Sequence, residues 1–303
     1  MPIIGRLNIP FYAARPVNLL ITVLVLSLSY YYLSHHVFLP QKTTSLSYVI
    51  TLLSTVFIML GGYIHNDALD VESDLKNKPE RVYISIYNFR KYKVVAFGLT
   101  TVGIGVCLFF FLIEKFPFQL VAAQLLFALL IYSYNEFLKS IPLLGNFIIA
   151  LLSAWAFILP ILFFKEVLDV NNIKEVFIKS LNLFTFALFS GLTMFTRELI
   201  KDEQDFEGDR IAGYKSFAQV VPNGIKSALY LACFITLTLL PFAFDLFNNS
   251  EFILLTVSLL SIPSVICGIF AFFPISKPNY KTSSLLLKLV MINGLILFYV
   301  ILL

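Results

Sequence analysis

Long apolar stretches alternate with short polar ones along the whole chain. Nine of these stretches are bounded by charged residues, Pro or Gly, and each has about the twenty residues that a helix needs to cross a bilayer. They lie near residues 17–38, 46–65, 93–113, 117–135, 142–164, 180–198, 225–244, 251–274 and 283–303. The pattern predicts an all-α, polytopic membrane protein with about nine transmembrane helices around a central cavity. Because the stretches are evenly spread, we expect a single transmembrane domain over residues 1–303.

The composition agrees with a membrane protein. Hydrophobic residues make up 59% of the chain and charged residues only 13%, and the mean hydropathy is +0.87. Soluble proteins carry about 25% charged residues, so this chain has too little polar surface to cover a water-soluble core. Secreted disulfide scaffolds, disordered proteins and nucleic-acid-binding domains are therefore excluded, and the membrane is the expected partner.

The distribution of basic residues predicts an orientation. If the N-terminus is cytoplasmic, the outer loops hold only Lys42, Lys115, Lys165, Lys174 and Lys179, and all other basic residues fall on the inner side. Cytoplasmic loops of membrane proteins are enriched in Lys and Arg. We therefore expect an integral protein of a bacterial or archaeal cell membrane, with the N-terminus inside and, after nine spans, the C-terminus outside.

Acidic residues gather in two short windows at the cytoplasmic ends of the second and sixth predicted spans. Two triads share a spacing of three and then four residues: Asp67, Asp70 and Asp74 (the first column), and Asp202, Asp205 and Asp209 (the second column). Residues at i, i+3 and i+7 share one face of a helix, so each triad projects a row of carboxylates. The windows place two Asp-rich cytoplasmic loops at about residues 66–92 and 198–224.

The two columns favour a divalent metal. Three like charges at the end of a membrane span repel one another and are costly to desolvate, so a cation should offset them. Asp oxygens and the neutral oxygen of the adjacent Asn66 suit Mg²⁺ or Mn²⁺, whereas Zn²⁺ more usually brings His or Cys. Mg²⁺ often takes only one or two protein carboxylates and completes its shell with water and phosphate. Two facing columns could hold metal ions on both sides of a diphosphate.

Basic residues lie beside both columns. Arg and Lys donors bind phosphate oxygens. Fixed cations around a departing diphosphate stabilise the negative charge that grows in the transition state. We therefore expect diphosphate binding by Lys76, Arg81, Arg197, Lys201, Arg210 and Lys215.

The acidic windows resemble the signatures of a known family, the UbiA-type intramembrane prenyltransferases. The first signature is matched by Asn66-Asp67-x-x-Asp70-x-x-x-Asp74, and the Asn-x-Pro-x-Arg tail that follows it by Asn77-x-Pro79-Glu80-Arg81. The second signature is similar to Asp205-x-x-x-Asp209-x-x-x-Gly213. The resemblance covers most of the chain, because the order of the loops and the number of spans also fit.

The resemblance implies a reaction and a set of roles. The reaction is Mg²⁺-dependent transfer of a polyprenyl group from an isoprenyl diphosphate to a lipid or aromatic acceptor held in the membrane. The implied metal ligands are Asn66, Asp70, Asp74, Asp205 and Asp209, with Asp67 and Asp202 as further catalytic members. The resemblance also implies that Lys139 binds diphosphate, and that substrate contacts come from Tyr134, with Tyr132 as an alternative, and from Asn146.

One aromatic residue is singled out by its position alone. Aromatic faces can stabilise a nearby cation, and Tyr63 lies one helical turn before Asp67. A polyprenyl carbocation that forms at the first column would lie close to this ring. We therefore expect Tyr63 to contact the substrate.

Three functions stay open. Arg197-Glu198-x-x-Lys201-Asp202 and the residues that follow are most similar to the family branch that adds geranylgeranyl to geranylgeranylglyceryl phosphate. Prenylation of an aromatic quinone precursor is the alternative within the family. A cation-coupled secondary transporter is an alternative of another class, although transporters place their acidic residues near the middle of broken helices rather than at one end.

Overall fold

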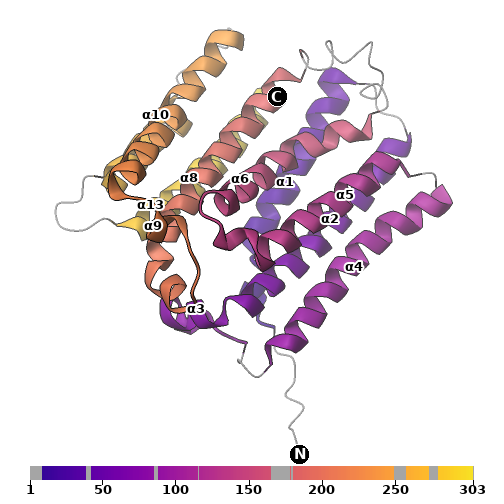
Figure 1. Ribbon diagram of the computed structural model, residues 1–303. Helices are drawn as coiled ribbons and strands as arrows, with labels where there is room; N and C mark the ends of the chain where they lie inside the picture. Colours follow the sequence, from indigo (N-terminus) through magenta and orange to yellow (C-terminus); the bar gives the residue numbers. More distant parts are fainter. Residues whose placement is uncertain are drawn as a thin grey trace, which may run out of the picture.

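The structure is a computed structural model that describes residues 9–38, 42–84, 88–114, 116–164, 178, 180–248, 257–272 and 279–302. Within these ranges the chain forms helices and no strands. The helices stand side by side in one bundle (Figure 1). In chain order they are α1 (Pro16–Tyr32), α2 (Lys42–Leu69), α3 (Val71–Asn77), α4 (Phe89–Glu114), α5 (Phe118–Glu136), α6 (Leu144–Ile158), α8 (Leu181–Ile211), α9 (Phe217–Val220), α10 (Asn223–Asn248), α12 (Ile262–Phe272) and α13 (Tyr280–Leu302).

Short 3₁₀ and π turns extend or separate these helices. They are η1 (Phe11–Ala14), η2 (Leu33–Val37), η3 (Pro79–Arg81), η4 (Leu138–Ser140), η5 (Leu159–Phe163) and η8 (Val257–Ser261). The η1 turn and α3 lie at the same end of the bundle, and α13 ends at the other (Figure 1). The ends of the described chain therefore lie on opposite faces, as the predicted odd number of spans requires.

Eight helical segments of the described chain are long and apolar enough to cross a membrane. They are Phe11–Val37, Ser45–Leu69, Phe89–Ile113, Phe118–Glu136, Leu144–Phe163, Leu181–Ile211, Asn223–Leu240 and Tyr280–Val300. Each corresponds to one predicted span. The eighth predicted span in chain order, near residues 251–274, is described only as η8 followed by α12, and its remaining residues lie outside the described ranges.

The outer surface of the bundle is apolar. On α4, for example, Val94, Phe97 and Leu112 have exposed fractions of 72%, 69% and 79%. A soluble protein rarely exposes so continuous an apolar face, whereas a lipid-facing helix requires one because the hydrocarbon core offers no partner for polar groups. The chain is therefore an integral membrane protein, as the composition predicted.

Glycines allow the tightest helix contacts. α2 packs along α4, and a Cβ atom built on Gly103 would lie 2.8 Å from the backbone oxygen of Ser54. A Cβ on Gly61 would lie 2.6 Å from the backbone oxygen of Ala96. Small residues are typical of membrane helices whose backbones approach closely, because packing rather than water exclusion holds them together.

The second acidic window is helical rather than a loop. Residues 198–211 form the last turns of α8, and irregular backbone is confined to residues 212–216 before α9. The prediction of a loop at about 198–224 was therefore wrong in its first half, although the predicted helical face was right. The polar sequence suggests a loop, but α3 and α9 pack against this end of α8 and keep it helical.

We expect Gly103→Ala to lower the thermal stability of the protein in detergent micelles. Overpacking of a close contact costs about 1–3 kcal/mol. The matched control is Gly105→Ala on the same helix, because nothing lies within 4 Å of a Cβ at Gly105. Thermal unfolding can be followed by the fluorescence of the single tryptophan, Trp155. Equal unfolding midpoints for the two variants would contradict the close contact.

Candidate active site

A cavity of about 720 Å³ opens in the middle of the bundle. Its walls come from α1, α2, α3, α5, α6, α8 and α13. Towards the interior of the bundle they are apolar, with Leu26, Phe127, Ile131 and Trp155 among the lining residues. Both acidic columns line the end of the cavity at which α2 meets α3 and α8 ends. The cavity is thus apolar in its depth and highly charged at one mouth.

Most of the residues that the sequence singled out meet in this cavity. The lining includes Asn66, Asp67, Asp70, Asp74, Asp202, Asp205 and Asp209. It also includes the basic residues Lys139, Arg197 and Lys201, together with Tyr63, Tyr134 and Asn146. Residues far apart in the sequence therefore converge on one site, at the ends of the second and sixth predicted spans that carry the acidic windows.

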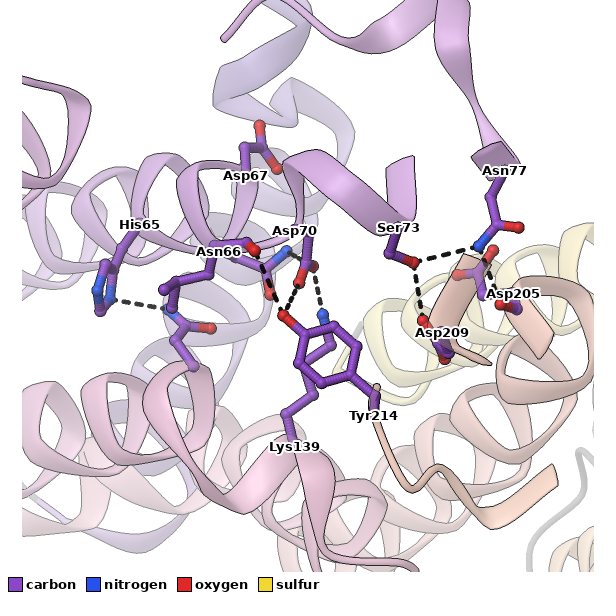
Figure 2. Close-up of polar contacts among 12 residues, drawn as sticks. His65, Asn66, Asp67, Asp70, Ser73, Asn77, Lys139, Asp205, Asp209 and Tyr214 are labelled. Carbon is purple, nitrogen blue, oxygen red and sulfur yellow. Dashed lines mark hydrogen bonds and ion pairs between the residues drawn. The ribbon is translucent and has the colours of Figure 1, made fainter. Parts of the chain in front are cut away.

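Asp70 stands at the centre of the first column, at the break between α2 and α3. The Lys139 ammonium forms an ion pair with its Oδ2, the amide of Asn66 donates to the same oxygen at 2.7 Å, and the Tyr214 hydroxyl donates to Oδ1 at 3.3 Å (Figure 2). Burial opposes ionisation of this carboxyl, but the Lys139 charge outweighs it and holds the pKa of Asp70 below its ordinary value. Asp70 is therefore a buried, fully partnered carboxylate.

Asp74 lies one turn further along α3 and has a different environment. Burial, together with the nearby Asp70 carboxylate, raises the pKa of Asp74 above its ordinary value. The two carboxylates of the first column thus repel each other across the cavity mouth. An added cation between them would relieve this repulsion.

Asp67 turns away from the other acids of the first column. Its carboxylate accepts hydrogen bonds from Arg15 Nη2 at 2.7 Å and from the Tyr83 hydroxyl at 3.1 Å. The Arg15 guanidinium also lies 4.7 Å from the centre of the Tyr63 ring. Asp67 therefore holds Arg15 at the cavity wall.

The two columns face each other because α3 packs on the last turns of α8. The Ser73 hydroxyl donates to Asp209 Oδ1 at 2.9 Å, and Lys78 Nζ lies 2.8 Å from Asp205 Oδ1. Asn77 bridges the helices in both directions. Its amide donates to the backbone oxygen of Asp205 (Figure 2), and its Oδ1 accepts a hydrogen bond from the Gly208 amide. Side chains of the first window thus hold the second column in place.

Two glycines in the second window make this contact possible. A Cβ atom on Gly208 would lie 2.5 Å from the backbone oxygen of Ser73, so α3 and α8 could not approach so closely with a larger residue. Gly213 has a φ of +77°, and the amides of Gly213 and Tyr214 donate back to the backbone oxygens of Arg210 and Asp209. This pattern is a Schellman motif, which ends a helix with a left-handed glycine. The turn brings Tyr214 back over Asp70.

Three of the predicted diphosphate ligands lie outside the cavity lining. Lys76, Arg210 and Lys215 are exposed, and Arg210 pairs with Glu207 at 2.8 Å. Lys78 lines the cavity where Lys76 does not, because it follows the last residue of α3, Asn77, and its φ of −148° and ψ of 57° turn the chain out of the helix. Arg81 ends η3, but its side chain lies outside the described part of the chain.

Arg15, Tyr83 and Tyr214 also line the cavity, although the sequence analysis did not assign them to the site. A cation before the first span is ordinary at an inner helix end, so the pattern gave Arg15 no special role. The sequence left open whether Tyr134 or Tyr132 belongs to the site, and the structure places these two side chains differently. Tyr134 lines the cavity, whereas Tyr132 stacks on His65, which itself bonds Glu136 at 2.9 Å.

The donor set fits a hard divalent cation that arrives with a phosphate. The carboxylate and amide oxygens of Asp70, Asp74, Asp209 and Asn66 suit Mg²⁺. Among the described residues, no group of three or more His, Cys, Asp or Glu side chains is arranged to hold a metal ion by itself. Mg²⁺ usually needs only one or two protein carboxylates when phosphate oxygens and water supply the rest. The oxygens at the cavity mouth meet that requirement.

We expect Lys139→Met to lower the free energy of unfolding by about 3 kcal/mol, because it leaves the buried Asp70 carboxylate unpaired. The double variant Asp70→Asn with Lys139→Met should regain most of this loss. Arg210→Met removes an exposed pair and should not change stability measurably. Unfolding in mixed detergent and dodecyl sulfate micelles measures all three variants, and additive losses in the double variant would count against the pair.

Comparison with known proteins identifies relatives for the chain. It is 25% identical to the digeranylgeranylglyceryl phosphate synthase of Methanobrevibacter smithii over 81% of this chain and 82% of that protein. It is 31% identical to the digeranylgeranylglyceryl phosphate synthase of Sulfurisphaera tokodaii over 67% of each chain.

The fold also matches solved structures. A UbiA homologue from Archaeoglobus fulgidus, solved with DMAPP and Mg²⁺, aligns with a TM-score of 0.58 at 16% identity over 95% of this chain and 98% of that one. The sequence model described as "UbiA prenyltransferase family" matches residues 19–292, which include both acidic columns. The fold, the order of the columns and the matched sequence lead to one conclusion: the chain belongs to the UbiA prenyltransferase family.

Proposed function

We propose that this protein transfers a polyprenyl group from an isoprenyl diphosphate to an acceptor held in the membrane. One observation carries the proposal: two columns of carboxylates face each other at the mouth of a cavity whose deeper walls are apolar. The charged mouth suits a diphosphate with its metal ions, and the apolar depth suits an isoprenoid chain. Membership of a prenyltransferase family favours this reaction over cation-coupled transport.

The names of the relatives suggest which donor and acceptor this protein uses. Several are digeranylgeranylglyceryl phosphate synthases, and they match more than half of the chain. We therefore infer that the donor is geranylgeranyl diphosphate and that the acceptor is geranylgeranylglyceryl phosphate. The alternative within the family, an aromatic quinone precursor, lacks that support from the relatives.

The diphosphate is proposed to bind between the columns, where Lys78 and Lys139 already lie against Asp205 and Asp70. When bound there, Mg²⁺ would be held by Asn66, Asp70 and Asp74 on one side and by Asp205 and Asp209 on the other, and it would neutralise charge on the leaving diphosphate. Mn²⁺ accepts similar oxygen ligands and should also support the reaction. The two ammonium groups can donate to the phosphate oxygens as negative charge develops on them.

The protein's own side chains would then assist cleavage of the allylic bond. The carbon–oxygen bond between prenyl group and diphosphate breaks with its electron pair on oxygen, which leaves a delocalised allylic cation. Apolar walls keep water away from this cation. Tyr63 and Tyr134 line the same cavity, and an aromatic ring can stabilise a nearby positive charge. Asp202, which accepts a hydrogen bond from Asn146 at 3.1 Å, lies on the α8 wall beside them.

We further propose an orientation. The charged cavity mouth lies at the end of the bundle where η1 and α3 are found (Figure 1). The positive-inside rule assigns that end to the cytoplasm, where soluble diphosphates are available. Residues 1–303 would form one transmembrane prenyltransferase domain in an archaeal or bacterial cell membrane.

The function is tested by incubating the purified protein with geranylgeranyl and farnesyl diphosphates and a panel of acceptors, followed by mass spectrometry of the products. We expect Asp70→Ala and Asp209→Ala to lower turnover by at least about a hundredfold, because each removes a carboxylate that would hold the Mg²⁺ needed to neutralise the leaving diphosphate. Glu72→Gln is the matched control, since Glu72 is exposed and lies outside the cavity lining. Normal turnover by either Asp variant would reject the proposed site.

Removal of divalent metal should stop the reaction. With excess chelator, we expect product formation to fall to background, since the columns and the diphosphate would repel each other without a bridging cation. Addition of Mg²⁺ above the chelator concentration should restore turnover, and Mn²⁺ should do so in part. Full activity in chelator would show that the columns have another role.

A further inference from the structure

Eight acidic side chains of the described chain line the cavity, and they differ in the groups that they contact. Four of them form an ion pair with a basic side chain: Asp67, Asp70, Glu198 and Asp205. Two more are proposed metal ligands, Asp74 and Asp209, and another, Glu80, is exposed. The eighth is Asp202, which has neither an ion pair among the described residues nor a proposed metal role.

Asp202 has one hydrogen-bond partner in the described part of the structure. The Asn146 amide donates to its Oδ2 at 3.1 Å. Lys201, its neighbour in the chain, forms its ion pair with Glu198 instead, at 3.4 Å. The Oδ1 of Asp202 is therefore left without a donor from the described residues, although the side chain lines the cavity.

The position of Asp202 is fixed by helix packing. It is the first member of the second column, and the next member follows three residues later, about 4.5 Å further along α8 towards the cavity mouth. Asn146 stands in the first turn of α6, next to Gly145, and a Cβ on Gly145 would lie 3.0 Å from the Cα of Lys139. Lys139 in turn pairs with Asp70. Asp202 thus lies between the charged mouth and the apolar walls, close to the segment that serves the first column.

The proposed transfer releases a proton when the acceptor is an alcohol. The acceptor oxygen bonds to the allylic carbon, and the bond from that carbon to the diphosphate breaks with its electron pair on the diphosphate oxygen. The hydroxyl proton must then leave the acceptor oxygen. Because water is kept away from the allylic cation, a base inside the cavity has to take this proton. The candidates are a carboxylate of the protein and the departing diphosphate.

We propose that Asp202 is the catalytic base, and that its Oδ1 accepts the hydroxyl proton of the acceptor. The assignment rests on the proposed prenyl transfer and adds the proton step to it. The other acids that line the cavity are poorer bases, because a nearby cation or metal ion favours the charged carboxylate. Asn146 holds Oδ2 and leaves Oδ1 to the acceptor. After the product leaves, the proton passes from Asp202 to water at the cavity mouth.

The test separates bond cleavage from proton removal in the full-length protein. The donor is geranylgeranyl diphosphate whose bridging oxygen, between the allylic carbon and phosphorus, carries an isotopic label. When the bond breaks and re-forms, the label exchanges with the other oxygens of the same phosphate. We expect Asp202→Asn to lower ether formation by about a hundredfold or more, and to leave this exchange detectable, because only the base is lost. Asp209→Ala should lose both, since the metal is needed for cleavage.

Two further variants complete the experiment. Added formate should restore ether formation in part in Asp202→Ala, because a small carboxylate can enter the space left by the side chain and act as the base. Glu207→Gln, on an exposed position of the same helix outside the cavity lining, should behave as wild type in both assays.

Normal ether formation by Asp202→Asn would overturn the proposal and assign the proton to the diphosphate. Loss of label exchange together with ether formation would also overturn it, because Asp202 would then act in bond cleavage. No effect of formate would count against it. If the wild-type protein forms no ether with any alcohol acceptor, the proposed function itself fails, and that result is seen before any variant is compared.

Discussion

Four carboxylates at the mouth of the apolar cavity each meet a compensating group from another part of the chain. Asp67 meets Arg15, Asp70 meets Lys139, Asp205 meets Lys78, and Asp209 meets Ser73. Each contact joins different segments, so neutralising the acids also fixes the relative positions of η1, α2, α3 and α8. The same interactions that make the buried charge tolerable thus assemble the site, because an unpaired buried charge would cost several kcal/mol.

Close backbone approach is the second requirement. Gly208 lets α3 rest on α8, and Gly213 ends α8 in a left-handed turn that returns Tyr214 to Asp70. Away from the site, Gly103 likewise allows the backbones of α2 and α4 to approach closely. In a bilayer, where lipid is as apolar as the helix surface, such packing supplies much of the association energy. Local glycine geometry therefore determines how near the two acidic columns come to each other.

The cavity has two regions with different chemistry: a charged mouth at one end of the bundle and apolar walls within it. The acids and their partners lie at one mouth, where a diphosphate and divalent ions can arrive from water. The apolar walls lie within the bundle, where an isoprenoid chain needs no polar partner. Tyr63 and Tyr134 line the same cavity. A single pocket can thus hold a charged leaving group, a reactive cation and two lipid chains without mixing their environments.

The sequence by itself determined the elements and the chemistry of this protein. Apolar stretches of membrane length predicted the helices, and the repeated spacing of Asp67, Asp70 and Asp74 and of Asp202, Asp205 and Asp209 predicted two carboxylate faces. These features depend on local periodicity, which the chain carries in its order of residues. Only the tertiary structure decided that Lys78 rather than Lys76 enters the cavity, and that Arg15 and Tyr214 complete the site. Such facts depend on the rotation and register of packed helices, and those are set by contacts between residues distant in sequence.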